Sequence, residues 1–152
     1  ASSIELENPY KLLRIAFSQT PSTYMSIRFS ETILKGITSK QIKDFTISLI
    51  ESNSPSYASA CFEAASNTIY YDRFEDTDDE DTVVAGWLEY FPEDKMLEKK
   101  DSDLLENPLI KKNPLKEGIL IETGKSPYDI YTFEGQELII QASLAMTNFQ
   151  RR

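Results

Sequence analysis

The chain has 152 residues, of which 40% are hydrophobic, and a formal net charge of −9. A chain of this length buries about 70% of the surface of its unfolded state, which predicts a single domain over 1–152. It has no histidine and one cysteine, Cys61. These counts exclude Ser-His-Asp and Cys-His catalysis, HExxH zinc sites and an internal disulfide.

The acidic balance also limits the classes of partner. A negatively charged chain does not bind nucleic acid by neutralising phosphates, and anionic lipid repels it. No run approaches the ~20 apolar residues of a membrane helix, and no signal peptide is visible. Together with the single thiol, these features lead us to expect a cytoplasmic protein.

Three elements are expected in the first third of the chain. Apolar residues at near-helical spacing predict a short helix over 10–17. Residues 22–29 alternate between polar and apolar side chains, which predicts a half-buried strand. Thr38 and Gln41 have the spacing of a capping box and open a clear amphipathic helix, which ends at the polar turn 53–56.

The middle of the chain predicts a β-hairpin, a helix and a long loop. Residues 57–74 form the hairpin, with its turn at 66–67. The small side chains of its first arm favour ordinary packing under a helix, with close approach of another backbone as the alternative. Helical spacing of apolar residues predicts a helix over 82–91. The charged, proline-punctuated stretch 93–117 predicts a long loop.

The last third predicts a meander of three strands. Residues 118–123 and 128–133 are rich in β-formers. Residues 138–147 fit a helix or a strand, and their alternation favours the strand; a helix there removes an edge strand but keeps the class. The predicted class is therefore α+β: a single, mainly antiparallel sheet, made of the hairpin and the meander, with helices packed on one face.

An acidic run is the strongest local signal. Residues 72–81 hold seven acids and one arginine, and so carry two thirds of the net charge. The run is interpreted as a solvated loop before a helix, as a patch that steers a basic partner, or as a nonspecific divalent-cation site. An EF-hand starting at Asp76 fails, because Asp81 stands where glycine is required and Trp87 where a glutamate is required.

Aromatic residues follow the acidic run, and aromatic anchors beside steering charge are common in protein interfaces. For Trp87, packing in the core is the favoured alternative to an interface role. The candidate partner-binding residues are Asp76, Asp78, Asp79, Glu80, Asp81, Trp87 and Tyr90.

No motif points to a cofactor, a metal or a catalytic group. The five glycines are too far apart for a dinucleotide or phosphate-binding loop. Cys61 lies in an apolar run and is interpreted as a small packed residue, since the chain offers no histidine to activate it. We therefore expect no cofactor, no metal site and no enzymatic activity.

The leading hypothesis is a non-enzymatic protein-binding module, such as an inhibitor, an immunity-type protein or an adaptor. It would dock a basic partner through residues 75–91. One alternative is a ligand-binding or enzymatic α+β domain that holds a small molecule on the concave face of the sheet, between Tyr, Glu and Arg28. Another is a structural domain of a larger assembly.

Overall fold

The computed structural model describes residues 12–20, 23–74, 84–93 and 107–146. The strands are β1 (Leu13–Thr20), β2 (Thr23–Phe29), β3 (Tyr57–Phe62), β4 (Leu88–Pro92), β5 (Ile110–Pro114) and β6 (Gly118–Thr123). The helices are α1 (Glu31–Leu34), α2 (Ser39–Asn53), α3 (Glu63–Arg73) and α4 (Phe133–Met146), with a 3-10 helix η3 (Pro127–Tyr131).

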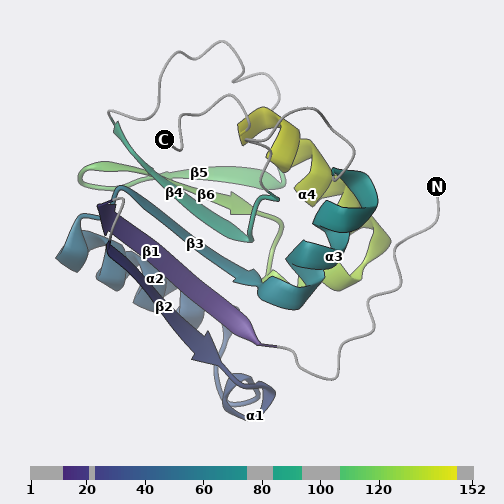
Figure 1. Cartoon of the computed structure of the whole chain (residues 1–152), viewed down its shortest axis with the longest axis horizontal. Helices are drawn as coiled ribbons and strands as arrows, with labels where there is room; N and C mark the ends of the chain where they lie inside the picture. The colour runs from purple at the N-terminus through teal and green to yellow at the C-terminus, as the bar shows by residue number, and fades with distance from the viewer. Residues whose placement is uncertain (1–11, 21–22, 75–83, 94–106, 147–152) are drawn as a thin grey trace.

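The six strands form one sheet in the order β2-β1-β3-β4-β6-β5, and every neighbouring pair is antiparallel (Figure 1). The α+β class with a single antiparallel sheet is therefore confirmed. The strand expected over 22–29 is β2, and the one expected over 118–123 is β6.

Helix α2 covers one face of the sheet. It begins as predicted: the Thr38 hydroxyl accepts the Gln41 N–H, and the Gln41 side chain accepts the Thr38 N–H. Its apolar stripe joins the large core cluster with β1, β3, β4 and β6. At its polar border Lys43 Nζ donates to Glu122 Oε1 of β6 at 2.8 Å, so α2 lies on the Glu122 side of the sheet.

Helix α4 covers part of the opposite face. Its residues Leu138 and Ala142 share a second core cluster with Ile121 of β6, Phe91 of β4 and Ile110 of β5. Ile121 and Glu122 are adjacent in one strand, so their side chains point to opposite faces. The helices therefore occupy both faces of the sheet rather than one.

Two predicted elements in the first half of the chain are wrong. The segment expected to be a helix over 10–17 is β1 from Leu13 onward, with Leu13, Ile15 and Phe17 buried on the α2 side. The predicted hairpin 57–74 is a strand, β3, followed directly by helix α3. Burial of Ala65 and Ile69 at helical spacing outweighs the β-propensity of this segment.

The second half needs further corrections. The helix expected over 82–91 is absent from the described part of that range, where 84–87 are irregular and β4 follows. The stretch 93–117, expected to be a loop, contains β5, while 94–106 lie outside the described residues.

The predicted C-terminal meander keeps only its first strand. The segment 128–133 is mostly η3, which Ser126 caps and Pro127 opens. The segment 138–147 belongs to α4 up to Met146.

Candidate functional site

One half of the α4 face of the sheet is not covered by any described helix. Helix α4 packs over β4, β6 and β5, whereas β2, β1 and β3 run side by side with no helix in front of them (Figure 1). We call their exposed side the open half-face; its rows, read from β2 to β3, are Arg28–Arg14–Cys61, Ser26–Ala16–Ser59 and Tyr24–Ser18–Tyr57.

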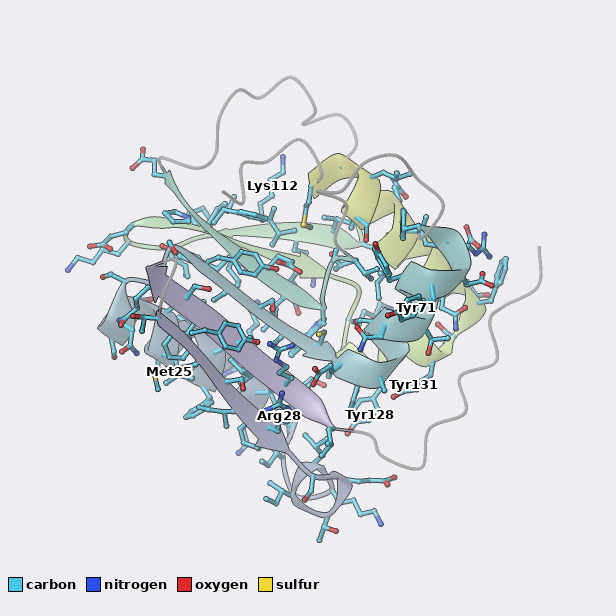
Figure 2. All side chains as sticks on the ribbon, in the orientation of Figure 1. Met25, Arg28, Tyr71, Lys112, Tyr128 and Tyr131 are labelled. Atoms are coloured by element: carbon cyan, nitrogen blue, oxygen red, sulfur yellow. The ribbon has the colours of Figure 1, made fainter. Side chains whose placement is uncertain are left out.

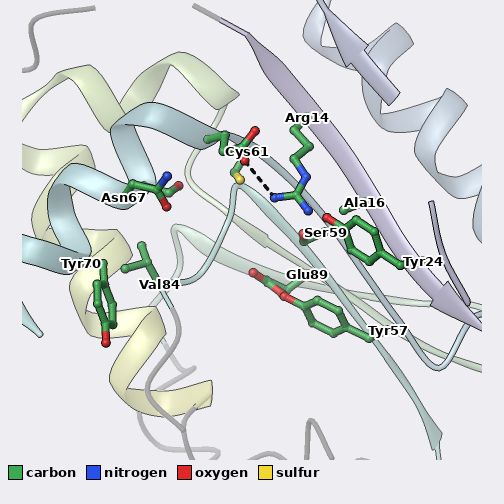
Figure 3. Close-up of a pocket in the computed structure, with 12 residues that line it drawn as sticks. Arg14, Ala16, Tyr24, Tyr57, Ser59, Cys61, Asn67, Tyr70, Val84 and Glu89 are labelled. Atoms are coloured by element: carbon green, nitrogen blue, oxygen red, sulfur yellow. Dashed lines mark hydrogen bonds and ion pairs between the residues drawn. The ribbon is translucent and has the colours of Figure 1, made fainter. Parts of the chain in front are cut away.

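The open half-face holds a pocket of about 410 Å³ (Figure 3). Small side chains form its floor, because Ala16 of β1 lies opposite Ser59 of β3. Larger side chains from β2, β3, β4 and α3 rise around this floor. The lining residues are Arg14, Ala16, Tyr24, Tyr57, Ser59, Cys61, Glu63, Ser66, Asn67, Tyr70, Val84 and Glu89.

An arginine–glutamate–arginine cluster forms one side of the site. Arg14 and Arg28 lie opposite each other in the β1–β2 register, an arrangement that by itself repels. Glu63, in the first turn of α3, relieves the repulsion. Its Oε1 accepts from Arg14 Nη1 and its Oε2 from Arg28 Nε, both at 3.3 Å. The Arg14 guanidinium also lies 5.1 Å from the centre of the Tyr24 ring.

A buried carboxylate lies at the other end of the pocket. Glu89 of β4 is only 1% exposed. Its Oε1 accepts the Gly86 N–H at 2.6 Å, and its Oε2 accepts the Tyr57 hydroxyl. Figure 3 shows the Glu89 carboxylate and the Tyr57 hydroxyl side by side above the strands. These hydrogen bonds offset the cost of removing the carboxylate from water and hold it at the pocket wall.

Cys61 also lines the pocket, but its thiol is not activated. Burial raises the pKa of Cys61 to about 11, and the negative charges of Glu89 and Glu63 act in the same direction. The Ser66 hydroxyl and the Arg14 cation lower this pKa, but by less. Since the thiolate is the nucleophile, a thiol with so high a pKa is poorly suited to covalent catalysis.

Of the predicted partner-binding residues, the two that the structure describes, Trp87 and Tyr90, do not line this pocket. Asp76, Asp78, Asp79, Glu80 and Asp81 lie outside the described residues. Trp87 is 3% exposed and Tyr90 is 1% exposed, and both belong to the large core cluster. The core encloses both rings. For Trp87 the sequence analysis favoured packing in the core over an interface role, and the structure agrees.

Sequence reasoning missed Arg14, Tyr24, Glu63 and Glu89. The alternation over 22–29 placed Tyr24 and Arg28 on one side of a strand, and this signal could have identified Tyr24 as a site residue. Glu63 and Glu89 gave no local signal, since their positions depend on α3 starting where β3 ends and on β4 pairing with β3.

The described residues contain no grouped metal ligands and no helix that could span a membrane. Among them, no three His, Cys, Asp or Glu side chains are grouped so that they could hold a metal ion. No described helix has both the length and the apolar character needed to cross a bilayer. No protein family, curated protein or solved structure was found to match the chain.

Proposed function

We propose that the protein is a non-enzymatic protein-binding module that docks a basic partner on the open half-face. One observation carries this proposal: half of a sheet face is left uncovered by the described helices and presents a pocket with tyrosine and arginine around it. Tyr and Arg are the residue types most enriched, with Trp, at the energetic centres of interfaces.

The shape of the open half-face suits a protein partner. Tyr24 stands at its outer side and is 54% exposed, so its ring is available for contact. The floor of Ala16 and Ser59 leaves room for one side chain of the partner to enter. A projecting ring beside a recess is a common form of interface anchor.

The charge of the chain favours a basic partner. The net charge is −9, and two thirds of it belongs to residues 72–81. The chain leaves α3 at Arg73 and returns at Val84, which lines the pocket. Negative charge tethered between these points accelerates the approach of a cationic protein over distances comparable with the Debye length.

The docking surface is tested by capture of basic proteins on the immobilised chain, followed by calorimetry with the purified partner. The Tyr24→Ala variant is expected to weaken binding by at least about tenfold, as for an interface anchor. The matched control is Phe133→Ala, because Phe133 lies on α4 away from the open half-face and is 39% exposed. Equal affinity for the wild type and Tyr24→Ala contradicts docking at this face.

The steering role of the acidic run has a separate test. Changing Asp76, Asp78, Asp79 and Asp81 to Asn is expected to slow association and flatten its salt dependence, with little effect on dissociation. The measurement is stopped-flow association at several salt concentrations. An unchanged association rate and salt slope refutes steering but leaves docking on the open half-face intact.

A small-ligand function is the second candidate, and the pocket favours it. A volume of about 410 Å³ lies in the range of small-molecule sites. Tyr57 and Glu89 at one end and Arg14 at the other would orient a polar guest. The test is ligand-observed NMR with a library of small polar molecules. Binding that is lost in Ser59→Phe, which fills the floor, together with no protein capture, supports this candidate over the first.

A further inference from the structure

The two edge strands of the sheet are protected to different degrees. β5 carries exposed Lys111 and Lys112 and ends in Pro114, which are typical devices against pairing with another strand. β2 is seven residues long and has no lysine or proline. Its one charged side chain, Arg28, is held by Glu63 and Ser26 on the open half-face. In the described part of the chain β2 is the last strand of the sheet, so its outer edge is open to strand pairing.

Apolar side chains accompany the β2 edge on the α2 side. Met25 is 50% exposed, and Figure 2 labels it with Arg28 on β2 at the outer edge of the sheet. Phe45 of α2 is 42% exposed and makes an edge-to-face contact with Phe29 of β2, at 6.0 Å between ring centres. Exposed apolar groups beside an unprotected edge are typical of an interface.

We propose that β2 pairs with β2 of a second copy of this chain and joins the two sheets into one of twelve strands. The residue sequence of β2 is self-complementary about Ser26. An antiparallel pair with Ser26 on the two-fold axis places Met25 opposite Ile27 of the second copy, both apolar and both on the α2 side. The same register places Tyr24 opposite Arg28, which allows a cation–π contact on the open half-face.

The pairing has a consequence for binding. Residues directly opposite in an antiparallel pair point to the same side, so the two open half-faces form one continuous surface. The dimer then presents two copies of the pocket on one side of the sheet. A partner with two basic contacts gains avidity from such a surface. The inference of a dimer depends on the β2 edge and does not depend on the proposed function.

The oligomeric state tests this inference directly. Sedimentation equilibrium from about 1 to about 500 µM is expected to show a monomer–dimer equilibrium. Higher salt is expected to tighten the dimer, because it screens the repulsion between two chains of charge −9. Met25→Lys is expected to weaken the dimer at least about tenfold. The control is Leu144→Lys, since Leu144 is 53% exposed but lies on α4.

A cysteine on the two-fold axis tests the register. In the proposed pair the two Ser26 residues are opposite each other, at a Cα separation of about 4.5–5.5 Å, which a disulfide spans. Oxidised glutathione is therefore expected to convert Ser26→Cys into a covalent dimer, whereas Thr23→Cys, opposite Phe29, stays monomeric on denaturing gels. A wild type that is monomeric at every concentration overturns the inference. The inference is also overturned if the dimer survives Met25→Lys or fails to cross-link through Ser26→Cys.

Discussion

Replacement of Trp87 by alanine is expected to be among the most destabilising changes in the chain. Trp87 is 3% exposed and packs in the large core cluster that also holds Leu88 and Ile139. Removing a buried indole ring leaves a cavity that the surrounding side chains fill only in part. Such truncations cost about 3–5 kcal/mol of the free energy of unfolding. A domain of this size is stable by about 5–15 kcal/mol, so the variant loses a large share of its stability.

A second substitution at the same position separates packing from hydrogen bonding. The Trp87 indole Nε1 is buried and has no hydrogen-bond partner among the described residues. Trp87→Phe retains most of the ring and removes this unpaired donor, so its cost is expected to be about 1 kcal/mol or less. The two losses of unfolding free energy are then compared. Packing predicts a much larger loss for Trp87→Ala than for Trp87→Phe, whereas a role in hydrogen bonding predicts similar losses in both variants.

The assay is urea unfolding followed by far-UV circular dichroism. Trp87 is the only tryptophan, so its fluorescence reports the same transition in the wild type. The matched control is Tyr71→Ala, because Tyr71 is 64% exposed on α3 and its loss is expected to change stability by less than about 0.5 kcal/mol. A midpoint for Trp87→Ala equal to that of the wild type refutes the placement of this ring in the core.

Three further predictions concern the thiol, a close backbone approach and an ion pair. Because burial raises the pKa of Cys61 to about 11, native labelling by a thiol reagent is expected to be slow near pH 8 and to rise about tenfold per pH unit toward pH 11. Rapid stoichiometric labelling at neutral pH contradicts this. A Cβ at Gly135 would stand 1.7 Å from the Asp129 carbonyl oxygen, so Gly135→Ala is expected to displace η3 from α4 and lower the melting temperature by several degrees. A melting temperature equal to the wild-type value rules that out. Lys43→Met leaves the nearly buried Glu122 carboxylate without the ammonium at 2.8 Å. Denaturant unfolding is expected to show a loss of about 1–3 kcal/mol in the free energy of unfolding. Adding Glu122→Gln in a double variant is expected to restore part of this loss. Additive single losses would show that the two residues are not coupled.

Local sequence patterns determined the elements whose signals are local. The Thr38–Gln41 capping box depends on two side chains three residues apart, and α2 begins where it predicts. Strict alternation determined β2, because only a strand places Met25, Ile27 and Phe29 on one face. The class followed from these elements, since a mixture of helices and closely spaced strands leads to an α+β fold.

Tertiary packing decided the elements that the local pattern left ambiguous. α4 is buried on several sides, at Leu138, Ile139, Ala142 and Ala145, and a segment with apolar residues on every side carries no clear period. β1 is flanked by β2 and β3, and pairing on both sides outweighs its helix-like apolar spacing.

The candidate site was likewise decided by the tertiary structure. Arg14, Glu63 and Glu89 are far apart in the sequence. They line one pocket only because β1 and β4 both pair with β3 and because α3 starts where β3 ends. Among the described helices, α4 packs over β4, β5 and β6 and leaves the β1–β3 half of that face without a helix. The coverage of a sheet face depends on the packing of several elements against one another, and no short stretch of residues encodes it.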